Sequence, residues 1–125
     1  MGSLFYGVNM REPMCSRPIV KLVKVGKLDN GSYEAFMLHV ERCRRCMFLL
    51  IKPGAIYRHY SGKLYRIVAI SKDDKSRRLL VTYKGTDSQA YWTRSLFDFF
   101  LFVDRPFYKS PRFKEKDYRV ADTQD

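Results

Sequence analysis

The sequence predicts an α+β fold that is mainly β: a small SH3-like antiparallel barrel with an N-terminal strand, an amphipathic helix and extended basic termini. Short apolar runs recur about every ten residues in the second half, polar turn clusters separate them, and no long helical pattern intervenes. We therefore expect an extended arm at residues 1–18, a strand and a helix at 19–53, an SH3-like β domain at 54–104, and a basic, aromatic tail at 105–125.

The segment before the β domain begins with a β-branched run, residues 19–25, which predicts a strand. Residues 33–51 fit an amphipathic helix, with Ser32 as its N-cap and Pro53-Gly54 as its stop signal. The alternative is a hairpin, in which the Asn30-Gly31 turn folds the chain back along the first strand. The apolar stripe of the helix would consist of Phe36, Val40, Cys43, Met47 and Leu50.

The β domain opens with an alternating strand at residues 55–60, followed by a Ser61-Gly62 turn. Residues 64–70 are apolar on both faces, which favours a strand inside a small barrel. A solvated loop follows at 71–78. Two further short strands are expected at 79–84 and 91–94, with a turn between them at 85–88. Ser95-Leu96-Phe97-Asp98 has the form of a capping box, which predicts one helical turn.

Several residues between 54 and 103 follow a recognisable order: Gly54, Tyr57, Arg58, His59, Tyr60, Gly62, Tyr65, Tyr83, Trp92, Arg94 and Phe97. In this order they resemble a small bacterial domain family of unknown function, whose members carry a Y-R-H-Y-K-G opening motif. Ser61 stands where the family has Lys, and Ser95 stands where it has Pro. The resemblance implies a small SH3-like β fold and brings no known chemistry with it.

The charge balance is the strongest functional signal, because 24 Lys and Arg residues outnumber 13 Asp and Glu residues and give a net charge of +11. A basic chain rich in aromatic residues is typical of proteins that bind a polyanion, and nucleic acid is the commonest one. The alternative is a basic surface that serves solubility alone. The predicted phosphate contacts are Arg42, Arg44, Arg45, Arg58, Arg77, Arg78, Arg112 and Lys114.

Aromatic side chains offer a second means of holding RNA, because bases stack on exposed rings. A platform on the β domain would consist of Tyr57, Tyr60, Tyr65 and Trp92. Core packing is the alternative for Trp92. The aromatic residues of the C-terminal tail have two interpretations as well, since they could stack on bases or wrap onto the chain's own barrel.

Cys43-Arg44-Arg45-Cys46 has the spacing of a zinc knuckle, and His39 lies four residues upstream. On a helix His39, Cys43 and Cys46 project to one side, and Cys15 from the arm could complete a tetrahedral Zn²⁺ site. The alternative is a pair of buried thiols on an apolar face, with no cofactor.

Three functions remain open. The leading prediction is a nonenzymatic RNA-binding protein, a small structural component of a ribosome or another ribonucleoprotein. The second is an accessory protein–protein subunit of a large complex, with the helix stripe and the aromatic tail as contact surfaces. The third is a small enzyme that uses His59 and Arg58, although no carboxylate lies at a spacing that suggests a catalytic pair.

The compartment is constrained only by composition. Three cysteines, an odd number, favour an intracellular and reducing compartment. The first 27 residues contain five basic residues and one acidic residue, so the mitochondrial matrix is one candidate, although Pro13 and Pro18 interrupt any targeting helix. No apolar run reaches the ~20 residues of a membrane span.

Overall fold

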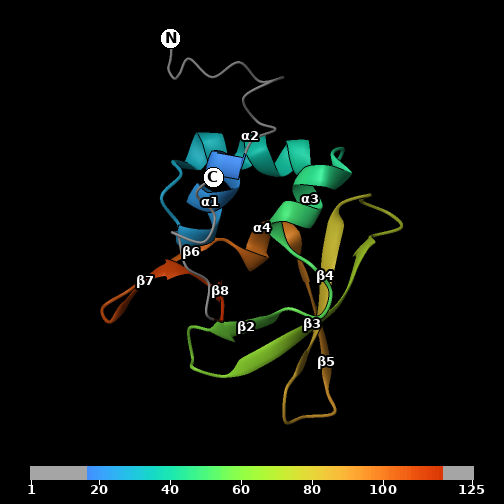
Figure 1. Cartoon of the computed structure of the whole chain (residues 1–125), viewed down its shortest axis with the longest axis vertical. Coiled ribbons are helices and arrows are strands. Elements are labelled where there is room, and N and C mark those ends of the chain that lie inside the picture. The colour runs from blue at the N-terminus through green and yellow to red at the C-terminus, as the bar shows by residue number, and fades with distance from the viewer. Residues whose placement is uncertain (1–16, 117–125) are drawn as a thin grey trace.

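The computed structural model describes residues 17–116, which form a helical group packed on an antiparallel sheet (Figure 1). The helices α1 (Arg17–Val25), α2 (Asn30–Val40) and α3 (Arg44–Leu50) gather on one side of the sheet, and α4 (Leu96–Phe99) lies between them and the strands. The strands are β2 (Ile56–His59), β3 (Leu64–Lys72), β4 (Leu79–Gly85), β5 (Tyr91–Ser95), β6 (Phe102–Arg105), β7 (Tyr108–Pro111) and β8 (Phe113–Glu115).

The main sheet has five strands in the order β5-β4-β3-β2-β8, and β6 and β7 form a separate pair. Every pairing is antiparallel, with a β-bulge in β3 between Ile67 and Ala69. The coarse prediction of an α+β fold dominated by antiparallel strands is therefore confirmed. The predicted closure into a barrel is not found among the described strands, because β5 and β8 form two open edges.

The core lies between the helices and the inner face of the sheet. Phe99 of α4 stacks on Phe113 of β8 with a centroid distance of 4.1 Å, and Tyr57 meets Phe99 edge-on at 5.2 Å. Burial of such rings supplies much of the hydrophobic stabilisation of a small domain. The fully buried side chains include Phe36, Met37, Leu50, Ile51, Tyr57, Ile67, Leu96, Phe99, Phe100 and Phe113.

Residues 19–25 form the helix α1, so the predicted strand is wrong. Val20 and Val23, three residues apart, are buried on one side of the helix. On the same helix the Lys24 ammonium reaches the Glu115 carboxylate of β8 at 2.6 Å. These tertiary contacts outweigh the modest preference of β-branched residues for strands.

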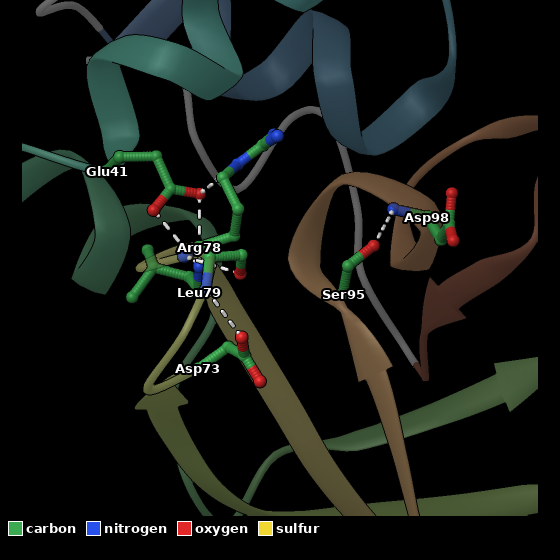
Figure 2. Close-up of polar contacts among 7 residues, drawn as sticks. Glu41, Asp73, Arg78, Leu79, Ser95 and Asp98 are labelled. Carbon is green, nitrogen blue, oxygen red and sulfur yellow. Dashed lines mark hydrogen bonds and ion pairs between the residues drawn. The ribbon is translucent and has the colours of Figure 1, made fainter.

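Residues 33–51 are helical, so the hairpin alternative is wrong. The chain forms two helices here, α2 and α3, instead of the single helix expected. α2 starts earlier than expected, because Asp29 and not Ser32 is its N-cap and accepts a hydrogen bond from the Ser32 backbone N–H at 2.9 Å. The helix breaks after Val40. The Glu41 carboxylate accepts hydrogen bonds from the Leu79 N–H at 3.0 and 3.2 Å and pairs with Arg78 at 3.5 Å, so the break is tied to the start of β4 (Figure 2).

The predicted strands and turns of the β domain are confirmed. The Ser61-Gly62 turn joins β2 to β3, and Gly62 has a φ of +101°, which a side chain would disfavour. Ser95 caps α4 by accepting a hydrogen bond from the Asp98 N–H at 3.1 Å (Figure 2). The single helical turn expected from the capping box is therefore present.

The described part of the predicted tail belongs largely to the fold. β8 pairs with β2, and the ring of Phe113 is buried. For Phe113, the interpretation in which the aromatic residues of the tail pack onto the chain's own β domain is therefore correct. Phe107, between β6 and β7, is fully exposed. The predicted N-terminal arm falls almost entirely outside the described residues. None of the helices within residues 17–116 is long and apolar enough to cross a membrane.

Candidate nucleic-acid interface

The outer face of the sheet, turned away from the core, carries basic side chains in neighbouring positions. Residues directly opposite each other on paired strands project to the same face. Arg66 of β3 lies opposite Lys84 of β4, and Arg58 of β2 lies opposite Lys114 of β8. Arg58 and Arg66 are diagonal neighbours, because Arg66 lies opposite Ile56, two residues before Arg58. The four cations thus form one continuous group across four strands, which we name the cationic face.

Within residues 17–116 no carboxylate forms an ion pair with the cationic face. Three of its cations are exposed, Lys84 is half-buried, and the described ion pairs involve none of them. The Arg58 and Arg66 guanidiniums each donate to a backbone carbonyl, of Gly62 and Gly54 respectively, at 3.2 Å. The other strand residues on this face are apolar or hydroxylic: Ile56, Leu64, Ala69, Ser71, Leu80, Thr82, Tyr91, Thr93 and Ser95.

This arrangement is unfavourable for the isolated fold. Like charges directly opposite each other destabilise a sheet, and solvent screening keeps the cost to about a few tenths of a kcal/mol for an exposed pair. The cationic face contains two such pairs, Arg66 with Lys84 and Arg58 with Lys114. A bound polyanion would turn the repulsion into attraction.

Tyr91 adds an exposed ring to the outer face. It lies opposite Lys84, its exposed fraction is 62%, and the Lys84 ammonium is 5.8 Å from its ring centroid. The ring belongs to the edge strand β5. The sequence analysis did not select Tyr91.

The predicted aromatic platform is not assembled. Tyr57 is fully buried, and its hydroxyl donates to the Leu50 carbonyl at 3.3 Å. Tyr65 lies opposite Gly85 on the inner face, in contact with the Tyr83 ring. Trp92 also projects to the inner side, opposite Tyr83, and its 53% exposure excludes the alternative of core packing. Tyr60 lies apart from these residues, against the Tyr108 ring at 5.7 Å.

A hollow of about 290 Å³ adjoins the cationic face at the β2–β8 edge. Arg58 and Lys114 line both the hollow and the face, and the rings of Tyr60 and Tyr108 form part of its wall. The hollow combines positive charge with aromatic surface, as proteins that hold nucleotides do. Its lining residues are Arg58, His59, Tyr60, Gly62, Tyr108, Lys114, Glu115 and Lys116.

His59 is held by its own turn. Its Nδ1 accepts a hydrogen bond from the Ser61 backbone N–H at 3.1 Å and lies 2.9 Å from the Ser61 hydroxyl. Burial lowers the pKa of His59, and the charges of Arg112 and Arg94 lower this pKa further. A neutral imidazole that accepts through Nδ1 carries its proton on Nε2. In this arrangement His59 has no free acceptor nitrogen for general-base chemistry.

The other predicted phosphate contacts lie in different surroundings. Arg42 and Arg44 line a separate hollow of about 360 Å³ beside the helix break, and Arg45 is exposed on α3. Arg78 pairs with Glu41, and Arg77 is exposed in the β3–β4 loop with a φ of +65°.

Arg112 is half-buried, and its Nε has no hydrogen-bond partner among the described residues. Of the eight predicted contacts, only Arg58 and Lys114 belong to the cationic face. The sequence analysis missed Arg66 and Lys84. Their positions in alternating strands were the available signal, but only the strand register shows that they are neighbours.

The predicted metal ligands converge within the described part of the chain. The donor atoms of His39, Cys43 and Cys46 all lie within 4.8 Å of one another. Burial lowers the pKa of His39, which favours its neutral imidazole. Cys15, the fourth predicted ligand, lies outside the described residues.

Comparison with known proteins identifies the β domain. Residues 55–115 match the model of a family described as "Protein of unknown function (DUF1653)". A crystal structure described as a protein belonging to DUF1653 from Bordetella bronchiseptica is 30% identical, with a TM-score of 0.46, and the match covers 51% of this chain and 85% of that chain. No curated protein matches this chain. The prediction of a small domain family of unknown function is confirmed in this form.

Proposed function

The chain carries a DUF1653 domain at residues 55–115, and we propose that this domain binds single-stranded RNA on the outer face of its sheet. The chain would act as a nonenzymatic component of a ribonucleoprotein. The observation that carries the proposal is the cationic face: Arg58, Arg66, Lys84 and Lys114 lie next to one another without a carboxylate partner among the described residues.

Phosphates supply the charge that this face lacks. Neighbouring strands lie about 4.8 Å apart, so the face from β8 to β4 extends over about 14 Å and can contact several phosphates of one strand. Arginine and lysine both donate charge-assisted hydrogen bonds to phosphate oxygens. Binding would therefore relieve the repulsion within the Arg66–Lys84 and Arg58–Lys114 pairs. This relief favours a role in ligand binding over a role in solubility alone, which would leave the repulsion in place.

Aromatic rings at both ends of the face favour a single strand over a duplex. Tyr91 is exposed at the β5 edge, and Tyr60 and Tyr108 wall the hollow at the β8 edge. Unpaired bases can stack on such rings, whereas the bases of a duplex are already stacked. A single strand that crosses the cations from Tyr91 to the hollow could place unpaired bases on the rings at both ends.

The two alternative functions have less support. The accessory-subunit prediction relied on the helix stripe and the aromatic tail, but Phe36, Val40, Leu50 and Phe113 are all in the core. The enzyme prediction relied on His59, whose Nδ1 is engaged by the Ser61 N–H. An acidic protein surface could use the same cations as RNA, so the test must distinguish the two partners.

The test measures binding of the full chain to a fluorescent single-stranded RNA by anisotropy at several salt concentrations. The variant Arg66→Gln/Lys84→Gln should bind more weakly than the wild type. It should also reduce the slope of log K against log salt by about 1.4, because each lost phosphate contact on a single strand contributes about 0.7.

Arg17→Gln/Lys27→Gln is the matched control. It removes one arginine and one lysine, both exposed and both outside the domain, and should leave the slope near that of the wild type. Equal losses in the two variants would mean that only net charge matters and would contradict the proposed face. Absence of RNA binding by the wild type, with binding to an acidic protein instead, would contradict the RNA proposal altogether.

A further inference from the structure

We propose that His39, Cys43 and Cys46 bind one Zn²⁺ ion in the break between α2 and α3, outside the DUF1653 domain. His39 lies in the last turn of α2, Cys43 is the N-cap residue of α3, and Cys46 lies in the first turn of that helix. The break is what brings them together. The three donor atoms lie within 4.8 Å of one another before any metal is added.

This spacing is close to what zinc requires. Bonds of about 2.3 Å to sulfur and 2.0–2.1 Å to imidazole nitrogen place the ligands of a tetrahedral ion about 3.5 Å apart. Small rotations of side chains would close the remaining difference. The site would need no rearrangement of the helices, since Glu41 already ties the break to Leu79 of β4.

The His39 ring provides an independent observation. Its Nε2 is buried and has no hydrogen-bond partner within residues 17–116. A buried polar nitrogen without a partner is costly, and proteins rarely leave one unexplained. A buried-thiol interpretation accounts for Cys46, which is fully buried, but it does not account for an imidazole directed into the same cluster. A metal bond through Nε2 would give this nitrogen the partner that it lacks.

The donor set selects the class of metal. Two thiolates and an imidazole are ligands for Zn²⁺ and not for Mg²⁺ or Ca²⁺, which prefer oxygen. The ion would fix the angle between α2 and α3, a structural role that is independent of RNA binding.

The test uses the full chain, purified under reducing conditions, stripped with a chelator and titrated with Zn²⁺ and with Co²⁺ as a spectroscopic substitute. We expect one metal ion per chain, a thiolate-to-Co²⁺ charge-transfer band that corresponds to two or three thiolates, and a thermal unfolding midpoint that falls when Zn²⁺ is removed. A third thiolate would identify Cys15 as the remaining ligand.

His39→Gln and Cys43→Ser should each weaken Zn²⁺ binding at least tenfold, and both residues are only half-buried, so both variants should fold. His59→Gln, the matched control at the chain's other histidine, should bind one ion as the wild type does. The proposal would be overturned by a wild type without a thiolate–Co²⁺ band, by unchanged unfolding after chelation, or by full Zn²⁺ affinity in His39→Gln.

Discussion

At the scale of single residues, His59 shows how the fold sets the chemistry of a side chain. Its ring packs against Phe113 at 4.9 Å, and its Nδ1 accepts the Ser61 N–H. Burial lowers its pKa from the ordinary value of 6.5, and the guanidiniums of Arg112 and Arg94 add to this effect. The result is a neutral histidine next to a cationic surface, suited to packing and hydrogen bonding.

The lowered pKa predicts a pH dependence of stability. The unfolded chain takes up a proton on this histidine near pH 6.5, whereas the folded chain does so only at lower pH. The free energy of unfolding should therefore be highest above pH 6.5 and decrease as the pH falls from 6.5 through the folded value. Urea unfolding at a series of pH values measures this, and His59→Gln should flatten part of the decrease.

An NMR titration of the His59 ring tests the cause. The wild-type pKa should lie below 6.5, and Arg94→Gln should raise it, because one of the repelling charges is removed. A wild-type value at or above 6.5 would show that the ring is neither desolvated nor repelled by these guanidiniums.

Residue types in the sequence indicated which side chains could bind phosphate, but not which of them are neighbours. Arg58 and Lys114 were selected and do lie opposite each other. Arg66 and Lys84 were not, because their adjacency depends on the β3–β4 register, which a bulge after Ile67 shifts. Tyr57 was expected to be exposed, but it is buried. Alternation along a strand shows which residues share a face, but it does not show which of the two faces packs on the core.

At the scale of elements, the packing of α1 against the β6–β7 pair depends on Gly26. This glycine follows α1 with a φ of +72°, and a Cβ there would lie 2.8 Å from Pro111 Cδ and 3.0 Å from Phe102 Cδ1. Both the backbone conformation and the available space exclude a side chain. The close approach lets the end of the helix contact the strand pair.

Gly26→Ala should therefore destabilise the protein by about 2 kcal/mol or more, the sum of left-handed strain and the clash with Pro111. Gly31→Ala is the matched control. Gly31 is the second residue of α2, and its Cβ would meet nothing closer than 3.6 Å, so this change should stabilise the helix by up to about 1 kcal/mol. Chemical denaturation of the two variants would contradict this account if their effects had the same sign.

The elements of the β domain could be predicted because local signals determine them. Alternation and turn residues located β2 to β5, and the Ser95 capping box located α4. Elements fixed by distant contacts could not be predicted. α1 depends on burial of Val20 and Val23, the break after α2 depends on Glu41 reaching Leu79, and β8 is only three residues long and exists by pairing with β2.

At the scale of the whole molecule, the two sides of the sheet differ in burial and in charge. The helices and α4 cover the inner face and complete the core, as Figure 1 shows. The outer side of the sheet contains the four residues of the cationic face and the exposed ring of Tyr91. The zinc site that we propose lies among the helices, so it is separate from the RNA-binding face that we propose on the sheet.

The most direct test of the account is to locate the bound RNA by NMR on the isotopically labelled full chain. On addition of single-stranded RNA, the amides of β2, β3 and β4 and the side-chain N–H signals of Arg58 and Arg66 should shift, together with the ring of Tyr91. Signals of α1 and α2 should stay unchanged. Shifts confined to the helices, or no shifts at moderate salt, would contradict the claim that the open sheet face is the binding surface.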